Sequence, residues 1–416
     1  MEEKQSLAIL VSIAERSSEV EESYRSLDEL ERLLNTAGAQ AVAKVVQVKE
    51  SFDPRTCIGK GKVTEISELC KAHEADLVVF DFELTPAQIR NLEEDIGADA
   101  TVIDRSMLIL DIFALHAVSG EGKLQVELAQ LKYSAPRLVG KGAQLSRQGG
   151  GIGSRGPGES KLETDRRHLH ERIVTLEGRL KELEHNRNVM RSQRDRSGLP
   201  KLALVGYTNA GKSTLLNRLT GADVLAEDKL FATLDPTTRK MELPSGESVL
   251  FTDTVGFIRK LPHHLVKAFK STLDEVRYSD VLLIVVDASD TEHGEQLKVT
   301  EQVIDELGAS DKPIIHVYNK CDFEPEVKYG AVSEGCVAVS AKTGEGIDAL
   351  LETIDELLKK SKKKAKLLIP YSDQSVVSVI YNNYTVEECE YLDNGVMVVA
   401  VLDSKGLGSF EKYLAE

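Results

Sequence analysis

Several features are scarce in this 416-residue chain. It has no tryptophan, and its longest apolar runs, residues 281–286 and 396–402, are far shorter than the roughly 18 to 20 residues of a membrane helix. The N-terminal Met1-Glu2-Glu3-Lys4 lacks the apolar stretch of a signal peptide. The five cysteines form no close pair of the kind that binds zinc. We therefore expect a cytoplasmic protein with reduced thiols and no membrane span.

Basic residues are also fewer than acidic ones. The chain carries 52 lysines and arginines against 68 aspartates and glutamates, a net charge of -16. If this charge is spread evenly, it argues against a nucleic-acid partner, because phosphate binding needs lysine and arginine. A hydrophobic fraction of 41% with 29% charged residues is ordinary for folded protein, and the length predicts about two to four domains.

Short β-like runs alternate with helical ones in the first 120 residues. Strands are predicted at residues 7–13, 41–48, 77–80 and 100–103, and helices at 24–34, 60–70, 86–95 and 107–114. Asp104 stands where the cap of the last of these helices belongs. Strands separated by helices of this length predict a parallel sheet, so we expect an N-terminal α/β domain over residues 1–120.

Residues 121–197 follow a different pattern. Residues 137–160 contain eight glycines and few apolar side chains, which predicts neither a helix nor a strand there. The apolar residues that follow recur at heptad intervals: Leu162, Leu169, Ile173, Leu176, Leu180, Leu183 and Met190. One helix over residues 159–194 should therefore lie along another over residues 121–133. We predict a helical hairpin with a glycine-rich loop at its tip.

A second alternating region covers residues 198–363, and a small α+β domain covers residues 364–416. Strands are predicted at residues 202–205, 240–243, 249–252, 281–286, 314–317 and 336–339, and helices at 212–219, 296–307 and 346–358. Asn394-Gly395 between two apolar runs predicts a β-hairpin. The lysine-rich residues 359–366 fit an interdomain linker better than a second RNA contact. The sequence thus predicts a multidomain α/β protein.

One segment of the second region fits the pattern of a phosphate-binding loop, because it follows an apolar strand and opens a helix. It consists of Gly206, Tyr207, Thr208, Asn209, Ala210, Gly211, Lys212 and Ser213. The glycines let backbone N–H groups face phosphate oxygens, Lys212 would reach the β- and γ-phosphates, and Ser213 would coordinate Mg²⁺. Standing alone, such a motif could also be an ordinary strand-to-helix turn.

Three further polar segments each follow a predicted strand. They are Asp253-Thr254-Val255-Gly256, Asn319-Lys320-Cys321-Asp322 and Ser340-Ala341-Lys342. Asp253 would hold Mg²⁺ through water, the Gly256 N–H would meet the γ-phosphate, and the Asp322 carboxylate would accept N1–H and the exocyclic amine of guanine. Each segment alone is an ordinary polar loop. Four segments in this order, each at the carboxyl end of a strand, predict GTP binding.

A segment between a helix and the next strand should respond to the γ-phosphate. It contains Phe231, Ala232, Thr233, Leu234 and Asp235, followed by Pro236. A threonine here is expected to coordinate Mg²⁺, so that the loop orders with GTP. Thr233, Thr237 and Thr238 compete for this role. We prefer Thr233 because the other two are expected to begin the strand.

With these motifs the chain resembles the HflX family of translation-factor-related GTPases over almost its whole length. The resemblance includes Phe-Ala-Thr-Leu-Asp-Pro at residues 231–236, Gly-Gly-Gly-Ile-Gly-Ser-Arg-Gly-Pro-Gly-Glu at 149–159, Leu-Gln-Val-Glu-Leu-Ala-Gln-Leu at 124–131, and Asp165-Arg166-Arg167. It implies a GTP phosphohydrolase that binds the large ribosomal subunit, in rescue or splitting of stalled ribosomes or in subunit biogenesis. It also implies Ser213 and Thr233 as magnesium ligands. We expect a monomer.

Positive charge is concentrated around the predicted hairpin. Residues 137–196 hold 14 basic and eight acidic residues, a net charge of +6, so the rest of the chain carries -22. A basic hairpin suits ribosomal RNA, although a solvated charged helix is the ordinary interpretation for an arbitrary protein. The alternative to a ribosome-directed GTPase is a nucleotide-gated switch that recruits protein partners, with RNA contact incidental.

Phe257 stands directly after Gly256, where Ras-like enzymes have the glutamine that orients the attacking water. Phenylalanine cannot form that hydrogen bond, so no catalytic side chain is assigned and we expect slow intrinsic turnover. A partner or another loop would supply the missing group. The two segments expected to respond to the γ-phosphate, residues 231–236 and 253–256, are called the switch segments. Arg239 and Arg259 flank them and could stabilise transition-state charge, but solvated arginines are the more ordinary interpretation of both.

Overall fold

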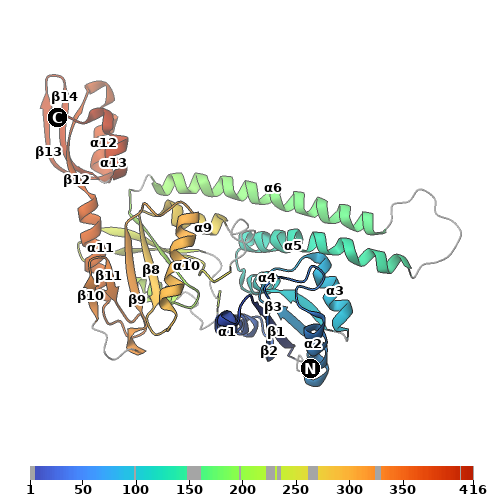
Figure 1. Ribbon diagram of the computed structural model, residues 1–416. Coiled ribbons are helices and arrows are strands. Elements are labelled where there is room, and N and C mark those ends of the chain that lie inside the picture. Colours follow the sequence, from blue (N-terminus) through green and yellow to red (C-terminus); the bar gives the residue numbers. More distant parts are fainter. Residues whose placement is uncertain are drawn as a thin grey trace. The chain divides into compact units, whose positions relative to one another are not determined.

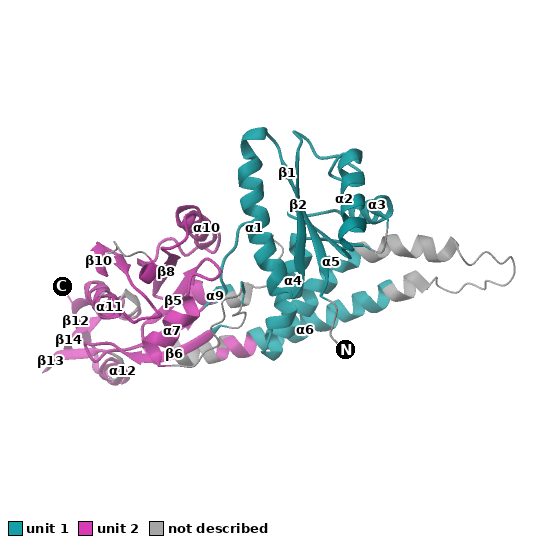
Figure 2. Cartoon of the chain, turned by 90° about the horizontal axis from the view of Figure 1, so that it is seen from below, with its two compact units in different colours: residues 1–184, 225–236, 254–274 teal, residues 185–224, 237–253, 275–416 magenta. Residues whose placement is uncertain are grey.

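A computed structural model gives the fold of the chain (Figure 1). The structure describes residues 5–97, 100–147, 161–195, 198–221, 230–231, 236–260, 270–323, 329–402 and 404–415. Contacts divide the chain into two compact units: residues 1–184, 225–236 and 254–274 in the first, and residues 185–224, 237–253 and 275–416 in the second (Figure 2). Residues 225–236 and 254–274 therefore belong to the N-terminal unit, although the chain on either side of each segment belongs to the second.

A four-stranded parallel sheet organises the N-terminal α/β fold. Its strands β1 (Leu7–Ala14), β2 (Gln40–Val48), β3 (Leu77–Phe80) and β4 (Thr101–Asp104) lie in the order β2-β1-β3-β4. Its helices are α1 (Val20–Thr36), α2 (Lys60–His73), α3 (Pro86–Ile96) and α4 (Arg105–His116). The Asp104 side chain accepts a hydrogen bond from the Met107 N–H, which caps α4 as predicted. The predicted parallel sheet is confirmed.

Two long helices, α5 (Gly120–Arg147) and α6 (Lys161–Asp195), form the predicted hairpin (Figure 1). Within the first unit, Arg172 pairs with Glu127 at 2.6 Å and Lys132 with Glu177 at 2.7 Å, which holds the helices side by side. Leu176 is fully buried, whereas most of its neighbours on α6 are exposed. The predicted narrow apolar seam is confirmed at this position.

The prediction that residues 137–160 exclude a helix is wrong for their first part. Helix α5 continues to Arg147 through Gly140 and Gly142. A glycine costs a helix about 1 kcal/mol relative to alanine, and a helix that is already nucleated can absorb two such residues. The glycine-rich segment at residues 149–159 lies outside the described residues.

A seven-stranded mixed sheet forms the core of the second unit, in the order β10-β11-β9-β8-β5-β7-β6. The strands are β5 (Lys201–Gly206), β6 (Thr237–Glu242), β7 (Ser248–Asp253), β8 (Val281–Asp287), β9 (Ile314–Asn319), β10 (Gly330–Ser333) and β11 (Cys336–Ala338). The helices of this unit are α7 (Lys212–Thr220), α10 (His293–Glu306) and α11 (Ile347–Ser361), and α9 (Lys270–Tyr278) is divided between the two units after Asp274. Strands β6 and β10 pair antiparallel and the others parallel.

The sequence pattern missed β10 and α9. Strand β10 is four residues long and contains glycine and serine, so it has too little apolar alternation to stand out. Helix α9 is short and rich in polar residues. Strand β10 depends on its pairing with β11 rather than on local preference.

A three-stranded antiparallel sheet with two helices forms the C-terminal fold. The strands β12 (Lys363–Ile369), β13 (Thr385–Leu392) and β14 (Gly395–Leu402) lie in the order β12-β14-β13, with α12 (Ser375–Asn383) and α13 (Ser404–Ser409). The predicted hairpin at Asn394-Gly395 is confirmed. Among the described residues, no helix combines the length and apolar character needed to cross a membrane.

The interpretation of the lysine run as a linker is wrong. Helix α11 extends to Ser361, and β12 begins at Lys363, so the run is divided between two regular elements. In β12 the side chains alternate: Lys364 and Lys366 are exposed, while Ala365 is buried. This two-residue period is that of a strand with one buried face, and it was obscured by the number of lysines.

Candidate nucleotide-binding site

The loop from β5 to α7 has the tight backbone that the sequence pattern requires. Gly206 has φ of +149°, and a Cβ there would lie 2.3 Å from the Val285 carbonyl oxygen. Gly211 has φ of +91°, and a Cβ there would lie 2.3 Å from the Asn319 Nδ2 atom. Glycine is therefore needed at both positions, which brings the loop against β8 and the Asn319 side chain.

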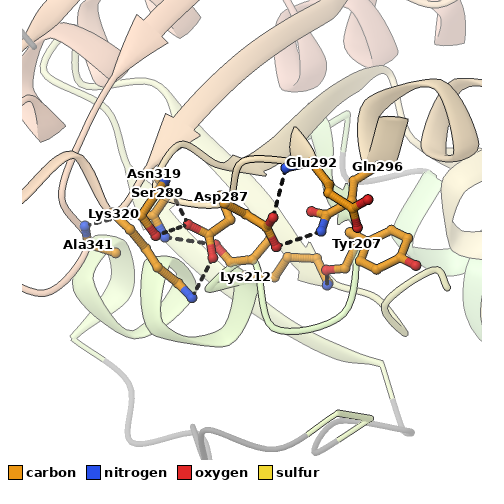
Figure 3. Close-up of polar contacts among 11 residues, drawn as sticks. Tyr207, Lys212, Asp287, Ser289, Glu292, Gln296, Asn319, Lys320 and Ala341 are labelled. Carbon is orange, nitrogen blue, oxygen red and sulfur yellow. Dashed lines mark hydrogen bonds and ion pairs between the residues drawn. The ribbon is translucent and has the colours of Figure 1, made fainter. Parts of the chain in front are cut away.

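Lys212 opens α7 and its side chain folds back over the loop. Its Nζ atom donates to the Tyr207 carbonyl at 2.7 Å and to the Gly206 carbonyl at 3.2 Å, as Figure 3 shows for Tyr207. Burial lowers the pKa of Lys212 to about 8, although the nearby Asp253 carboxylate favours the charged form. The buried ammonium thus has two carbonyl acceptors that a stronger anionic acceptor could replace.

Ser213 and Asp253 meet in the second unit. The Ser213 hydroxyl donates to Asp253 Oδ2 at 2.6 Å, and Asp253 is fully buried at the end of β7. A hydroxyl and a carboxylate oxygen this close are hard oxygen donors, which Mg²⁺ prefers. The donor set therefore fits a magnesium ion.

Asn319, at the end of β9, is hydrogen-bonded to the phosphate-binding loop and to one of the segments predicted to recognise the base. Its Nδ2 atom donates to the Ala210 carbonyl at 2.9 Å, and its Oδ1 atom accepts from the Ala341 N–H at 2.9 Å. The Ser340 hydroxyl donates to Asp322 Oδ1 at 2.7 Å. The structure therefore brings together the phosphate-binding loop and two of the other predicted segments at the carboxyl ends of the parallel strands, where α/β sheets bind ligands.

Two residues of this cluster were missed in the sequence. Asp287, at the end of β8, pairs with Lys320 at 2.8 Å and accepts from the Ser289 hydroxyl at 2.6 Å (Figure 3). Arg218 on α7 donates to the carbonyls of Ala341, at 3.0 Å, and Lys342. The signal available for Asp287 was its place directly after an apolar strand. Arg218 gave no such signal, because its contact joins residues more than 120 positions apart.

The two predicted switch segments are described in part. Ala232, Thr233, Leu234 and Asp235 lie outside the described residues, so the choice of Thr233 stays a prediction, while Thr237 begins β6 as expected. Thr254, Val255 and Gly256 are buried directly after β7, and the Phe257 side chain is 1% exposed.

The fold and the chain's matches to family models define its class. The models are GTP-binding GTPase N-terminal over residues 24–114, GTP-binding GTPase Middle Region over 116–194, 50S ribosome-binding GTPase over 201–320, and HflX C-terminal domain over 327–408. The protein is thus a multidomain P-loop GTPase.

Its relatives identify the family within that class. The chain is 50% identical to GTPase HflX of Lacrimispora saccharolytica over 97% of this chain and 95% of that one. It is 51% identical to GTPase HflX of Caldanaerobacter subterraneus over 94% of this chain and 90% of that one. It is 45% identical to GTPase HflX of Escherichia coli over 88% of this chain and 87% of that one. The chain belongs to the HflX family of GTPases.

Proposed function

We propose that this GTPase acts on the large ribosomal subunit and hydrolyses GTP there, in rescue or splitting of stalled ribosomes or in subunit biogenesis. The match of residues 201–320 to the 50S ribosome-binding GTPase family carries this proposal. A basic hairpin supports it, because exposed arginines such as Arg166 and Arg179 on α6 are available to phosphates. Action on ribosomes would place the protein in the cytoplasm.

In this proposal the second unit binds the phosphates of GTP. The N–H groups of the loop from Gly206 to Ser213 face the phosphate oxygens, and Lys212 exchanges its two carbonyl acceptors for the β- and γ-phosphates. Ser213 and Thr233 would hold Mg²⁺, with Asp253 as a water-mediated partner. Bound magnesium supplies positive charge that offsets the negative charge developing on the phosphates.

The base is read by the loops that Asn319 joins. Asp322 would accept hydrogen bonds from guanine N1–H and its exocyclic amine, and the backbone of Ser340, Ala341 and Lys342 would meet the guanine carbonyl. The bond from the Ser340 hydroxyl holds one oxygen of Asp322 in place. This orientation would favour guanine over adenine, because adenine lacks the matching pair of donors.

Hydrolysis would need a group that Phe257 does not provide. The Phe257 side chain is apolar and buried, so it can neither donate to nor accept from an attacking water. We expect the ribosome to supply or order the missing group, as protein partners do for other GTPases.

The hairpin can be tested by cosedimentation with purified large subunits. We expect Arg166→Glu/Arg179→Glu to weaken binding of the full chain with a GTP analogue bound, and the loss to be greater at low salt, where phosphate contacts contribute most. Lys71→Glu/Lys240→Glu is a matched control, because both lysines are exposed, lie outside the hairpin and the lysine-rich residues 359–366, and change the charge equally. Equal binding of the two double variants would contradict the role of the hairpin. Absence of wild-type binding would favour the alternative, a nucleotide-gated switch that recruits proteins.

A further inference from the structure

A buried carboxylate lies at the carboxyl edge of the N-terminal sheet. Asp81 directly follows β3 and is fully buried. Its Oδ1 atom is 2.7 Å from the Arg105 guanidinium, and its Oδ2 atom accepts from the Ser26 hydroxyl at 2.6 Å. This edge is where parallel α/β sheets bind their ligands.

The chain itself occupies this edge with Lys260. The Lys260 Nζ atom is 2.5 Å from Asp81 Oδ2 and 3.0 Å from the Ser26 hydroxyl. Lys260 follows Gly256 by four residues, and all three side chains belong to the same compact unit. The contact therefore links the segment after Asp253 to the N-terminal fold.

The charges of the cluster favour a cation at this place. Arg105 also pairs with Glu29 on α1 at 3.1 Å, so within this cluster two carboxylates face one guanidinium. The Lys260 ammonium restores the balance. Burial opposes ionisation of Asp81, but Arg105 and Lys260 outweigh it and hold the pKa of that carboxyl below its ordinary value.

The geometry of Lys260 suits a contact that can be released. Its backbone has φ of +53°, a left-handed conformation that costs a non-glycine residue about 1 kcal/mol or more, so the contact holds the residue in a strained state. Its side chain is half-exposed, so it can return to water. After release, Asp81 keeps Arg105 and Ser26 as partners, and the N-terminal fold need not open.

The other switch segment contacts the same unit. Phe231, two residues before Thr233, is buried with φ of +59°, and its ring packs edge to face on Phe113 of α4 with centroids 4.8 Å apart. Residues 225–236 and 254–274 both belong to the N-terminal unit, whereas the phosphate-binding loop belongs to the second. Two independent contacts thus join the nucleotide-responsive segments to the N-terminal fold.

We propose that Asp81 is a positioning residue that holds Lys260 and transmits the nucleotide state to the N-terminal domain. The inference rests on the proposed binding of GTP by residues 206–213. Four residues span at most about 14 Å, so Lys260 stays within that distance of Gly256, and a rearrangement of Gly256 by the γ-phosphate would reach Lys260 along the chain. The contact of Lys260 with Asp81, at the carboxyl edge of the N-terminal sheet, then differs between the GDP and GTP states.

Hydrogen exchange of the full chain tests this coupling. We expect amides of residues 77–85 to exchange at different rates with GDP and with a non-hydrolysable GTP analogue. In Lys260→Met this difference should fall by about threefold or more, while Lys260→Arg should retain it. Lys240→Met is the matched control, since Lys240 is an exposed lysine of β6. The half-exposed position of Lys260 makes Lys260→Met safer for folding than a change at buried Asp81.

The outcomes separate the inference from the function on which it rests. Affinity for GDP and for the GTP analogue is measured on every variant. A wild-type difference that persists in Lys260→Met, or wild-type protein that binds both nucleotides without any difference at residues 77–85, would overturn the inference. Failure of the wild type to bind GTP would overturn the proposed nucleotide site as well.

Discussion

Lys212 is the residue whose charge should control nucleotide affinity most directly. Its pKa is lowered to about 8 by burial, and phosphates would raise it again on binding. Because the neutral amine forms above the pKa of the free protein, binding then requires uptake of a proton. Affinity for GDP should therefore weaken about tenfold between pH 7 and pH 9. Titration calorimetry across this range checks the effect, and a flat dissociation constant would contradict it.

Asp322 should determine the choice of base. In Asp322→Asn the side-chain amide faces guanine donors with a donor of its own, so GTP affinity should fall. Xanthosine triphosphate has a carbonyl in place of the exocyclic amine, and its affinity should rise. Competition between the two nucleotides measures the switch. An unchanged preference would refute the assignment.

Asp287 should act through Lys320 rather than on the nucleotide. Lys320 has φ of +64°, and its ion pair with Asp287 holds that strained residue in the base-recognition segment. Asp287→Asn should weaken GDP binding roughly tenfold by removing one charge-assisted contact. Asp290→Asn, in the same loop, changes the charge equally and serves as the control. Equal GDP affinities of the two variants would contradict a role of Asp287 in nucleotide binding.

At the scale of elements, Leu176 is the side chain on which the hairpin seam can be tested. Leu176→Ala should lower local stability by about 2–5 kcal/mol, because it leaves a cavity at a fully buried position. Native-state hydrogen exchange of α5 and α6 measures this loss. Val174→Ala is the control, since Val174 is largely exposed and should cost less than about 0.5 kcal/mol. The exposed ion pairs of the hairpin should contribute little in comparison.

Local patterns predict the elements well where they are periodic. The expected strand at residues 77–80 is β3, and the expected helix at residues 86–95 is α3 with one further residue. The pattern fails where local preference is overridden, as in α5 beyond Pro136, or where lysines hide a two-residue period, as in β12.

The site was predictable to the extent that its residues are adjacent in sequence. The phosphate-binding loop and the segment from Asn319 to Asp322 follow strands whose apolar runs are visible. The contacts of Asp81 with Lys260 and of Phe113 with Phe231 join residues more than 100 positions apart, and no periodicity encodes them. Only the fold brings these pairs together.

At the scale of the whole molecule, the net charge of -16 does not describe the surface that we propose for RNA. The hairpin region is positive in an otherwise acidic chain, so acidity elsewhere should disfavour other orientations on the ribosome. The N-terminal unit includes both switch segments, which would let binding at the ribosome and the nucleotide state influence each other.

Single-turnover hydrolysis of GTP, with and without purified large ribosomal subunits, tests the central claim most directly. Because buried Phe257 cannot orient water, the full chain alone should hydrolyse GTP slowly. Saturating large subunits should increase the rate by about 100-fold or more, as partners that complete a GTPase site do. Arg166→Glu/Arg179→Glu should reduce this stimulation and leave the intrinsic rate unchanged. Equal rates with and without subunits would contradict the account.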